Sequence, residues 1–183
     1  MFDKVYLIFL FFLFTFCNST DSSQIKLVSN DMLQKNYTGF GKYIHENNDE
    51  YIGKFLNGKA HGQGKFVSFD GKYSESGTYE NGVLVKGVVK FPNGITQQGN
   101  FSKSGLEGIG KTIFPKQKKQ LCKASEEGVY VNGFLVNGVR RYSDGARYEG
   151  EFRDSVRHGY GKFYLGDSLI FEGKWETDYF VED

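Results

Sequence analysis

The chain has 183 residues, and its 23 Lys and Arg nearly balance 22 Asp and Glu, giving a formal net charge of +1. This balance excludes a global basic field of the kind that attracts nucleic acid, so any basic site must be local. An apolar content of 39% suits one modest domain, and 24 Gly with only 2 Pro favour short strands joined by tight turns.

Residues 1–19 are typical of a secretory signal peptide. An apolar run from Val5 to Phe16 follows a short polar head and precedes small polar residues. The run is shorter than the roughly 20 residues that a membrane-spanning helix needs, so a permanent anchor is disfavoured. Cleavage would follow Cys17 or Ser19. Lipoprotein anchoring through Cys17 is the less favoured alternative, and the sequence predicts a secreted or extracytoplasmic protein.

The rest of the chain divides by composition into three segments. Residues 20–36 are expected to be a polar linker, residues 37–176 a repeat array, and residues 177–183 an acidic tail that could protect a sheet edge. Asn36 and Asn100 stand in Asn-X-Ser/Thr motifs, which would be glycosylation acceptors in a eukaryotic secretory pathway.

Glycine recurs through the array with a period near 23 residues, and an aromatic residue follows each glycine at the second position. Because side chains alternate between the two faces of a strand, the glycine and the aromatic lie on the same face. The glycines are Gly53, Gly77, Gly99, Gly128, Gly150 and Gly173. The aromatics are Phe55, Tyr79, Phe101, Tyr130, Phe152 and Trp175.

Turn signals follow each of these segments. Asn-Gly pairs such as Asn57-Gly58 predict type I′ turns, whose two central residues need positive φ. Ser104 and Ser155 replace the turn glycine in the third and fifth units, so a less regular hairpin is expected there. A second strand and a second glycine turn complete each unit. Each repeat is therefore predicted to be one β-hairpin, and the chain to be a meander.

A further glycine marker, seen first as Gly62-Gln63-Gly64, predicts close approach between backbones or between a ring and a strand. Stacked hairpins bury rings that a single hairpin cannot bury, so stability is expected to be nearly additive along the array. On this basis Phe101→Ala in the middle is predicted to cost more than Trp175→Ala at a frayed end.

The consensus Y-x-G-x-aromatic-x-N-G-x-x-x-G-x-G resembles the MORN repeat, the membrane occupation and recognition nexus motif. The first and fifth full units, YIGKFLNGKAHGQGKF and YEGEFRDSVRHGYGKF, carry the resemblance best, and it covers residues 37–176 as about five full units with partial units at the ends. The resemblance implies an all-β fold: an elongated antiparallel meander of stacked hairpins in a twisted, largely single-layered sheet.

The resemblance also implies a non-catalytic scaffold that mediates protein–protein interaction, here expected outside the cytoplasm. Its aromatic-lined face would contact a protein partner whose identity the sequence leaves open. An open meander has two unpaired edges, through which copies could form a homo-oligomer. Candidate partner-binding residues are Phe55, Tyr79, Phe101, Tyr130, Phe152 and Trp175.

The alternative function is that of a peripheral membrane or phospholipid-binding module. The spacing between repeats lengthens between the third and fourth units, and the added segment is basic. A solvated loop is the favoured interpretation of such a charge run. The candidate residues for contact with an anionic lipid surface are Lys116, Lys118, Lys119 and Lys123.

The sequence predicts no catalytic, cofactor or metal site. A phosphate-binding loop would need glycine at position 59 and Ser or Thr at position 66, where the chain has Lys59 and Phe66. His61 and His158 share one repeat register, and His45 has no partner at ligand spacing. We therefore expect neither an enzyme nor a nucleic-acid-binding protein.

Overall fold

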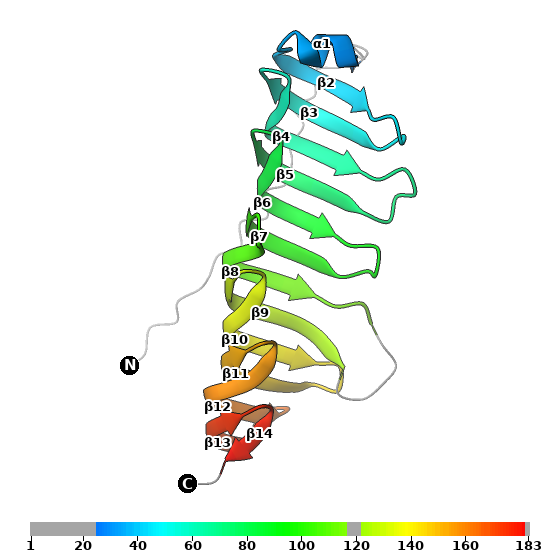
Figure 1. Ribbon diagram of the computed structural model, residues 1–183. Coiled ribbons are helices and arrows are strands. Elements are labelled where there is room, and N and C mark those ends of the chain that lie inside the picture. The colour runs from blue at the N-terminus through cyan, green and yellow to red at the C-terminus, as the bar shows by residue number, and fades with distance from the viewer. Residues whose placement is uncertain (1–24, 117–121, 182–183) are drawn as a thin grey trace, which may run out of the picture.

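A computed structural model describes residues 25–116 and 122–181 of the chain. The described residues form one open sheet of 14 strands in chain order, together with one short helix (Figure 1). The elements are β1 (Leu27–Val28), α1 (Asn30–Gln34), β2 (Gly39–Ile44), β3 (Glu50–Leu56), β4 (Lys59–Val67), β5 (Ser74–Glu80), β6 (Val83–Lys90), β7 (Thr96–Ser102), β8 (Gly105–Ile113), β9 (Lys123–Val131), β10 (Phe134–Tyr142), β11 (Ala146–Arg153), β12 (Val156–Leu165), β13 (Ser168–Glu176) and β14 (Tyr179–Val181).

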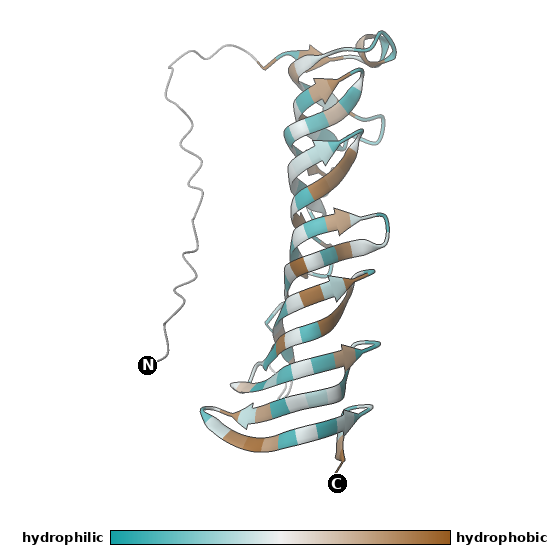
Figure 2. Cartoon of the chain, turned by 90° about the vertical axis from the view of Figure 1, so that its left-hand side faces the viewer, coloured by the Kyte–Doolittle hydropathy of each residue, from teal (hydrophilic) through white to brown (hydrophobic). Residues whose placement is uncertain are grey.

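The predicted meander of hairpins is confirmed. β1 runs parallel to β2, and every later neighbouring pair is antiparallel. The sheet is a tall twisted ribbon without a second layer, and polar and apolar residues alternate along many strands (Figure 2). We call the face that carries Tyr51 and Phe55 the ring face, and the face that carries Lys54 and Lys65 the open face.

The Asn-Gly turns have the positive φ that type I′ geometry requires, as in Asn57 with 50° and Gly58 with 75°. The prediction of a less regular hairpin at Ser155 is wrong. Asp154 and Ser155 adopt the positive φ of the other turns, 49° and 66°, without a glycine. Aspartate reaches this region more readily than most residues, and the surrounding strands hold it there. At the Ser104 turn the positive φ of 115° moves to Gly105.

A line of glycines crosses the sheet at its centre, with one glycine opposite the next on each neighbouring strand. Cβ atoms at Gly64 and Gly161 would lie 2.1 and 2.2 Å from the hydroxyls of Tyr51 and Tyr148, so these rings lie directly over the glycines. The predicted clearance role is thus observed. The line comprises Gly41, Gly53, Gly64, Gly77, Gly87, Gly99, Gly110, Gly128, Gly138, Gly150, Gly161 and Gly173.

Gly77→Ala is expected to lower the free energy of unfolding by about 1–3 kcal/mol, the usual range for overpacking. The new Cβ would lie 2.1 Å from the carbonyl oxygen of Lys86, at a φ of 152° that side chains rarely adopt. Denaturant titration of the purified chain measures the loss. Ser76→Ala, on the exposed open side of the same strand, is the control and should change stability by less than about 0.5 kcal/mol. Equal losses in the two variants would contradict the clearance role.

The core consists of two clusters of buried side chains on the ring face, and half-buried Phe101 packs against both. β-Bulges beside the glycine line, such as that between Gly53 and Phe55, bend the strands. The strand ends near the Asn-Gly turns therefore curl out of the plane of the sheet (Figure 1). The first cluster is Val28, Tyr51, Phe55, Tyr79, Leu84 and Val89, and the second is Leu106, Tyr130, Leu135, Tyr148, Phe152 and Trp175.

Both ends of the array are capped, which corrects the expected linker and tail. The described part of the linker forms β1 and α1, and Val28 is 2% exposed within the first cluster. The described part of the tail forms β14, whose Phe180 packs 5.4 Å from the ring of Trp175. The amino-acid composition does not predict these caps, because one or two apolar residues are enough to hold a short segment against the core. β1 pairs with only Lys42 and Tyr43 of β2, and β14 pairs with only residues 174–176 of β13, so residues 168–173 of β13 remain an unpaired edge of the described sheet.

The signal peptide predicted at residues 1–19 lies outside the described residues. Within residues 25–116 and 122–181, no helix has the length and apolar character required to cross a membrane.

Candidate functional site

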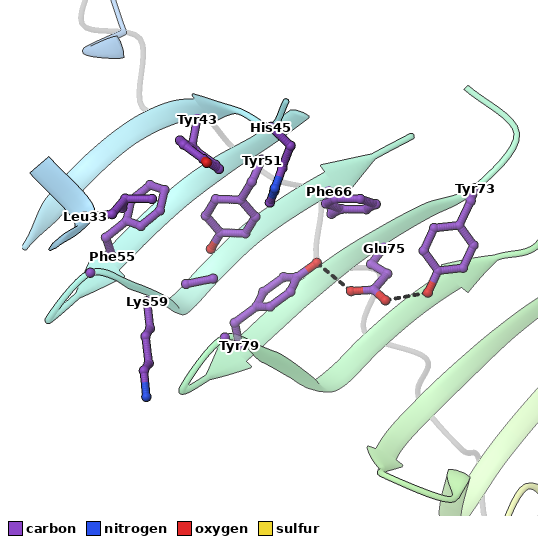
Figure 3. Close-up of a pocket in the computed structure, with 13 residues that line it drawn as sticks. Leu33, Tyr43, His45, Tyr51, Phe55, Lys59, Phe66, Tyr73, Glu75 and Tyr79 are labelled. Carbon is purple, nitrogen blue, oxygen red and sulfur yellow. Dashed lines mark hydrogen bonds between the residues drawn. The ribbon is translucent and has the colours of Figure 1, made fainter. Parts of the chain in front are cut away.

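A groove of about 500 Å³ opens on the ring face between β2 and β5, and we call it the first groove. Aromatic side chains from four strands surround it, because the repeat places one ring beside the glycine line on strand after strand (Figure 3). Apolar concave surfaces with few polar groups are typical of binding sites. The lining residues are Leu33, Tyr43, His45, Tyr51, Phe55, Gly58, Lys59, Ala60, Phe66, Tyr73, Glu75, Tyr79 and Gly82.

Glu75 supplies the carboxylate among these lining residues. It accepts hydrogen bonds from the hydroxyls of Tyr73, at 2.5 Å, and Tyr79, at 3.1 Å. No described Lys, Arg or His forms a salt bridge with it, and Figure 3 shows the ammonium of Lys59 directed away from it. The groove therefore holds an acidic group whose charge is oriented by two phenols and is not neutralised by a neighbouring cation.

The tyrosines around this carboxylate are held in their protonated form. Burial raises the pKa of Tyr51 to about 12. Burial also raises the pKa of Tyr73 and of Tyr79 well above the ordinary tyrosine value, and the negative charge of Glu75 raises both further. The phenolic protons of Tyr73 and Tyr79 therefore remain donors to Glu75 throughout the neutral pH range, whereas the Tyr51 hydroxyl donates to the carbonyl of Lys54.

The free energy of unfolding is expected to fall as pH rises above about 10. Unfolded tyrosines titrate near pH 10, whereas the folded chain raises the pKa of Tyr51 to about 12 and so retains that proton longer. A raised folded pKa contributes stability that is complete below about pH 10 and is lost as pH rises toward the folded value. Denaturant titrations at a series of pH values measure how the free energy of unfolding depends on pH. Tyrosinate absorbance reports the ionisation of the phenols over the same range.

Tyr51→Phe should reduce this pH dependence, whereas Tyr160→Phe should preserve it because Tyr160 is 65% exposed. A stability independent of pH above 10 would contradict the assignment.

A second groove, of about 220 Å³, lies between β5 and β8 and shares Tyr73 and Glu75 with the first. The carboxylate of Glu75 thus belongs to both hollows, which together follow the ring face over the N-terminal half of the array. The lining residues are Tyr73, Glu75, Val83, Leu84, Val89, Phe91, Gln97, Phe101, Ser102, Lys103 and Gly105.

The structure places the six candidate aromatics in or near the core. Phe55 and Tyr79 line the first groove, and Phe101 lines the second. The other three pack into the second cluster, namely Tyr130, Phe152 and Trp175 at 1%, 5% and 3% exposure. They do not form a continuous exposed contact surface, because the bent strand ends cover them.

The main polar group of the grooves, Glu75, is absent from the sequence-based candidates. A signal for it exists, since an acidic residue stands two positions before the repeat glycine both at Glu75 and at Glu126. Aromatics on the following strands, Phe66 and Phe91, could be assigned to hairpins but not to a groove. Which of these residues face a hollow depends on how far the strands bend.

Two of the four candidate lysines, Lys116 and Lys123, lie in the described part of the chain. Lys116 is exposed, while Lys118 and Lys119 lie outside the described residues. Lys123 forms a salt bridge with Glu126 at 3.3 Å and lies over the ring of Phe114.

Other lysines lie on the open face. Lys54, Lys65 and Lys86 are exposed there, and none forms a salt bridge with a described carboxylate. Farther along the same face, Lys111 pairs with Glu127 at 3.2 Å, and Lys162 pairs with Glu172 at 2.8 Å. Lys54, Lys65 and Lys86 all lie in the N-terminal half of the described sheet.

The histidines do not assemble a metal site within the described ranges, where no group of three His, Cys, Asp or Glu side chains could hold an ion. His45 packs edge-on against the rings of Tyr43 and Phe66, at 4.6 and 5.8 Å between centroids. His45 thus serves as one of the groove walls.

Comparison with known proteins identifies the repeat. The family model described as the MORN repeat matches residues 51–73, 127–147 and 148–169. Alsin from Rattus norvegicus is 31% identical over 136 residues, and Alsin from Homo sapiens is 30% identical over the same length. Each match covers 70% of this chain but only 7% of the relative. The chain thus spans a small part of the curated proteins that it resembles.

Proposed function

Because the chain is a MORN-repeat protein, we propose that it is a scaffold that binds a protein partner outside the cytoplasm. Its repeats indicate a non-catalytic repeat protein that binds other molecules. The extracytoplasmic part of the proposal is supported by the signal-peptide pattern of residues 1–19.

The observation that carries the proposal is the first groove, whose walls are rings already positioned by the sheet. Tyr51 contacts Phe55 and Tyr79 edge-to-face at 5.1 and 5.2 Å, so these rings are fixed before any partner arrives. Binding to a preformed groove avoids the entropic cost of ordering side chains. A partner segment that lays apolar side chains along the groove would bury aromatic surface, as in other peptide-recognition modes.

Site-specific photo-cross-linking tests this function in the full chain expressed in cells of its source. A photoreactive phenylalanine at position 66, in the first groove, is expected to form discrete protein adducts. The matched control is the same residue at position 88 on the open face. Discrete adducts from position 66 alone support the groove. Identical adducts from both positions, or none from position 66, would overturn it.

A second candidate is peripheral association with anionic membranes, favoured by the unpaired lysines Lys54, Lys65 and Lys86 on the open face. Basic side chains on one face of a protein attract anionic lipid head groups, and salt weakens the attraction. Co-sedimentation with phosphatidylserine vesicles is expected at low salt and should be lost in the triple Lys→Gln variant. Absence of binding at low salt, where attraction is strongest, would remove lipid as a ligand.

A further inference from the structure

Four consecutive strands of the array repeat the preceding four at a constant offset of 51 residues. Gly77 of β5 corresponds to Gly128 of β9, and the later glycines of β6–β8 and β10–β12 correspond at the same offset. Leu84 and Leu135 occupy one register of the two copies, and both are buried. The two copies can therefore be compared position by position. Residues that differ between them indicate where one copy has a different local function.

In the second copy an arginine occupies the ring face beside the acidic residue. Arg140 contacts Glu126 through Nε at 2.8 Å and through a terminal nitrogen at 2.7 Å. The same guanidinium donates to the carbonyl of Ser155 at 2.8 Å and lies 4.6 Å from the ring centre of Phe152. Carboxylate, carbonyl and ring together form a complete guanidinium site, which the chain fills with its own side chain.

The first copy keeps the acidic residue, the aromatic ring and the serine of this site but lacks the arginine. Glu75, Phe101 and Ser104 stand at the positions of Glu126, Phe152 and Ser155, whereas Val89 stands at the position of Arg140. The valine side chain has no polar atom that could bond to Glu75. The second groove opens at this place, and Glu75, Val89 and Phe101 all line it.

We propose that the second groove binds an arginine side chain of a partner protein, with Glu75 as its acceptor and Phe101 as the ring beside its guanidinium. The partner arginine takes the place that Arg140 fills in the second copy. This inference rests on the proposed scaffold function and names the chemistry that the partner presents. All five arginines of this chain lie within residues 140–157, so the N-terminal half supplies none of its own.

Arginine fits this site better than lysine does. A planar guanidinium can bond a carboxylate with two nitrogens while it stacks on a ring, and an ammonium cannot do both. Lys103 also lines the second groove, but it forms no salt bridge with any described carboxylate, Glu75 included. Two phenols hold the carboxylate of Glu75 in place, which leaves an acceptor oriented for an incoming donor.

Selection from a random-peptide library displayed on phage, with the full chain as target, tests the proposal. Selected peptides are expected to share an arginine, and citrulline at that position should weaken binding by about tenfold or more. Val89→Arg supplies the missing side chain internally and should abolish binding while preserving or raising thermal stability. Glu75→Gln should weaken binding to a similar extent as citrulline does.

Val88→Arg is the matched control, because it adds the same charge to the neighbouring residue on the open face and should leave binding unchanged. Selected peptides that lack arginine, or arginine peptides insensitive to Val89→Arg and Glu75→Gln, would overturn the inference. The cross-linking test from position 66 is independent of these variants, so the scaffold function can survive that result. Failure to select any peptide counts against both the arginine site and the scaffold function.

Discussion

Replacing Trp175 with alanine is expected to lower the free energy of unfolding by about 3–5 kcal/mol, the usual cost of removing a buried tryptophan. Trp175 is 3% exposed and packs within 5.4 Å of both Tyr148 and Phe180. The guanidinium of Arg157 lies 4.4 Å from its ring, and the indole N–H donates to the carbonyl of Gly161 at 3.2 Å. Removing the indole would leave a cavity that the bent strands cannot close.

Phe101→Ala, the matched variant, is expected to cost less, which reverses the order that the sequence predicts. Phe101 is only half-buried at the junction of the two clusters, whereas β14 covers the ring at the C-terminal end. Denaturant titration and hydrogen exchange of both variants decide the order. A smaller loss for Trp175→Ala than for Phe101→Ala would show that this end of the array frays.

Arg140→Met should also destabilise the fold by about 3–5 kcal/mol, because it leaves a buried carboxylate without its main partner. The side chains of Arg140 and Glu126 are only 3% and 9% exposed. Methionine preserves most of the volume, so the loss reports mainly the uncompensated charge. Equilibrium unfolding in denaturant measures it.

The double variant Glu126→Gln with Arg140→Met should recover part of that loss, since neither charge remains buried. Lys123→Met is a milder control, because the side chain of Lys123 is 35% exposed and its salt bridge to Glu126 is peripheral. A single-variant loss below about 1 kcal/mol, or no recovery in the double variant, would show that water already solvates Glu126.

Much of the fold is predictable because its determinants are local. A glycine and an aromatic two residues apart share a face of any strand, and Asn-Gly favours one turn type wherever it occurs. Hairpin order then follows from chain order, since each strand pairs with the next. The caps were missed because Val28 and Phe180 stand in segments too short to show a periodic pattern.

The candidate site is less predictable because it depends on how deeply each ring is buried and on where a charged residue lacks a partner. The sequence marks Phe55 and Trp175 as equivalent, yet Phe55 lines a groove while Trp175 is enclosed by its neighbours. The importance of Glu75 follows from Val89 standing where Arg140 stands in the second copy. That difference is visible in the sequence, but its meaning requires the pairing of Glu126 with Arg140 across β9 and β10.

The sequence by itself determined the repeat, the hairpin turns, the strand faces and the MORN family, because these depend on spacings of a few residues along one strand or turn. Only the tertiary structure decided which rings are core and which line grooves, and which charged groups find partners. Those outcomes depend on bulges that bend the strands at the glycine line, and on side chains that meet across neighbouring strands. Spacing alone does not specify how far a sheet bends, so burial and charge pairing emerge only when all the strands are in place.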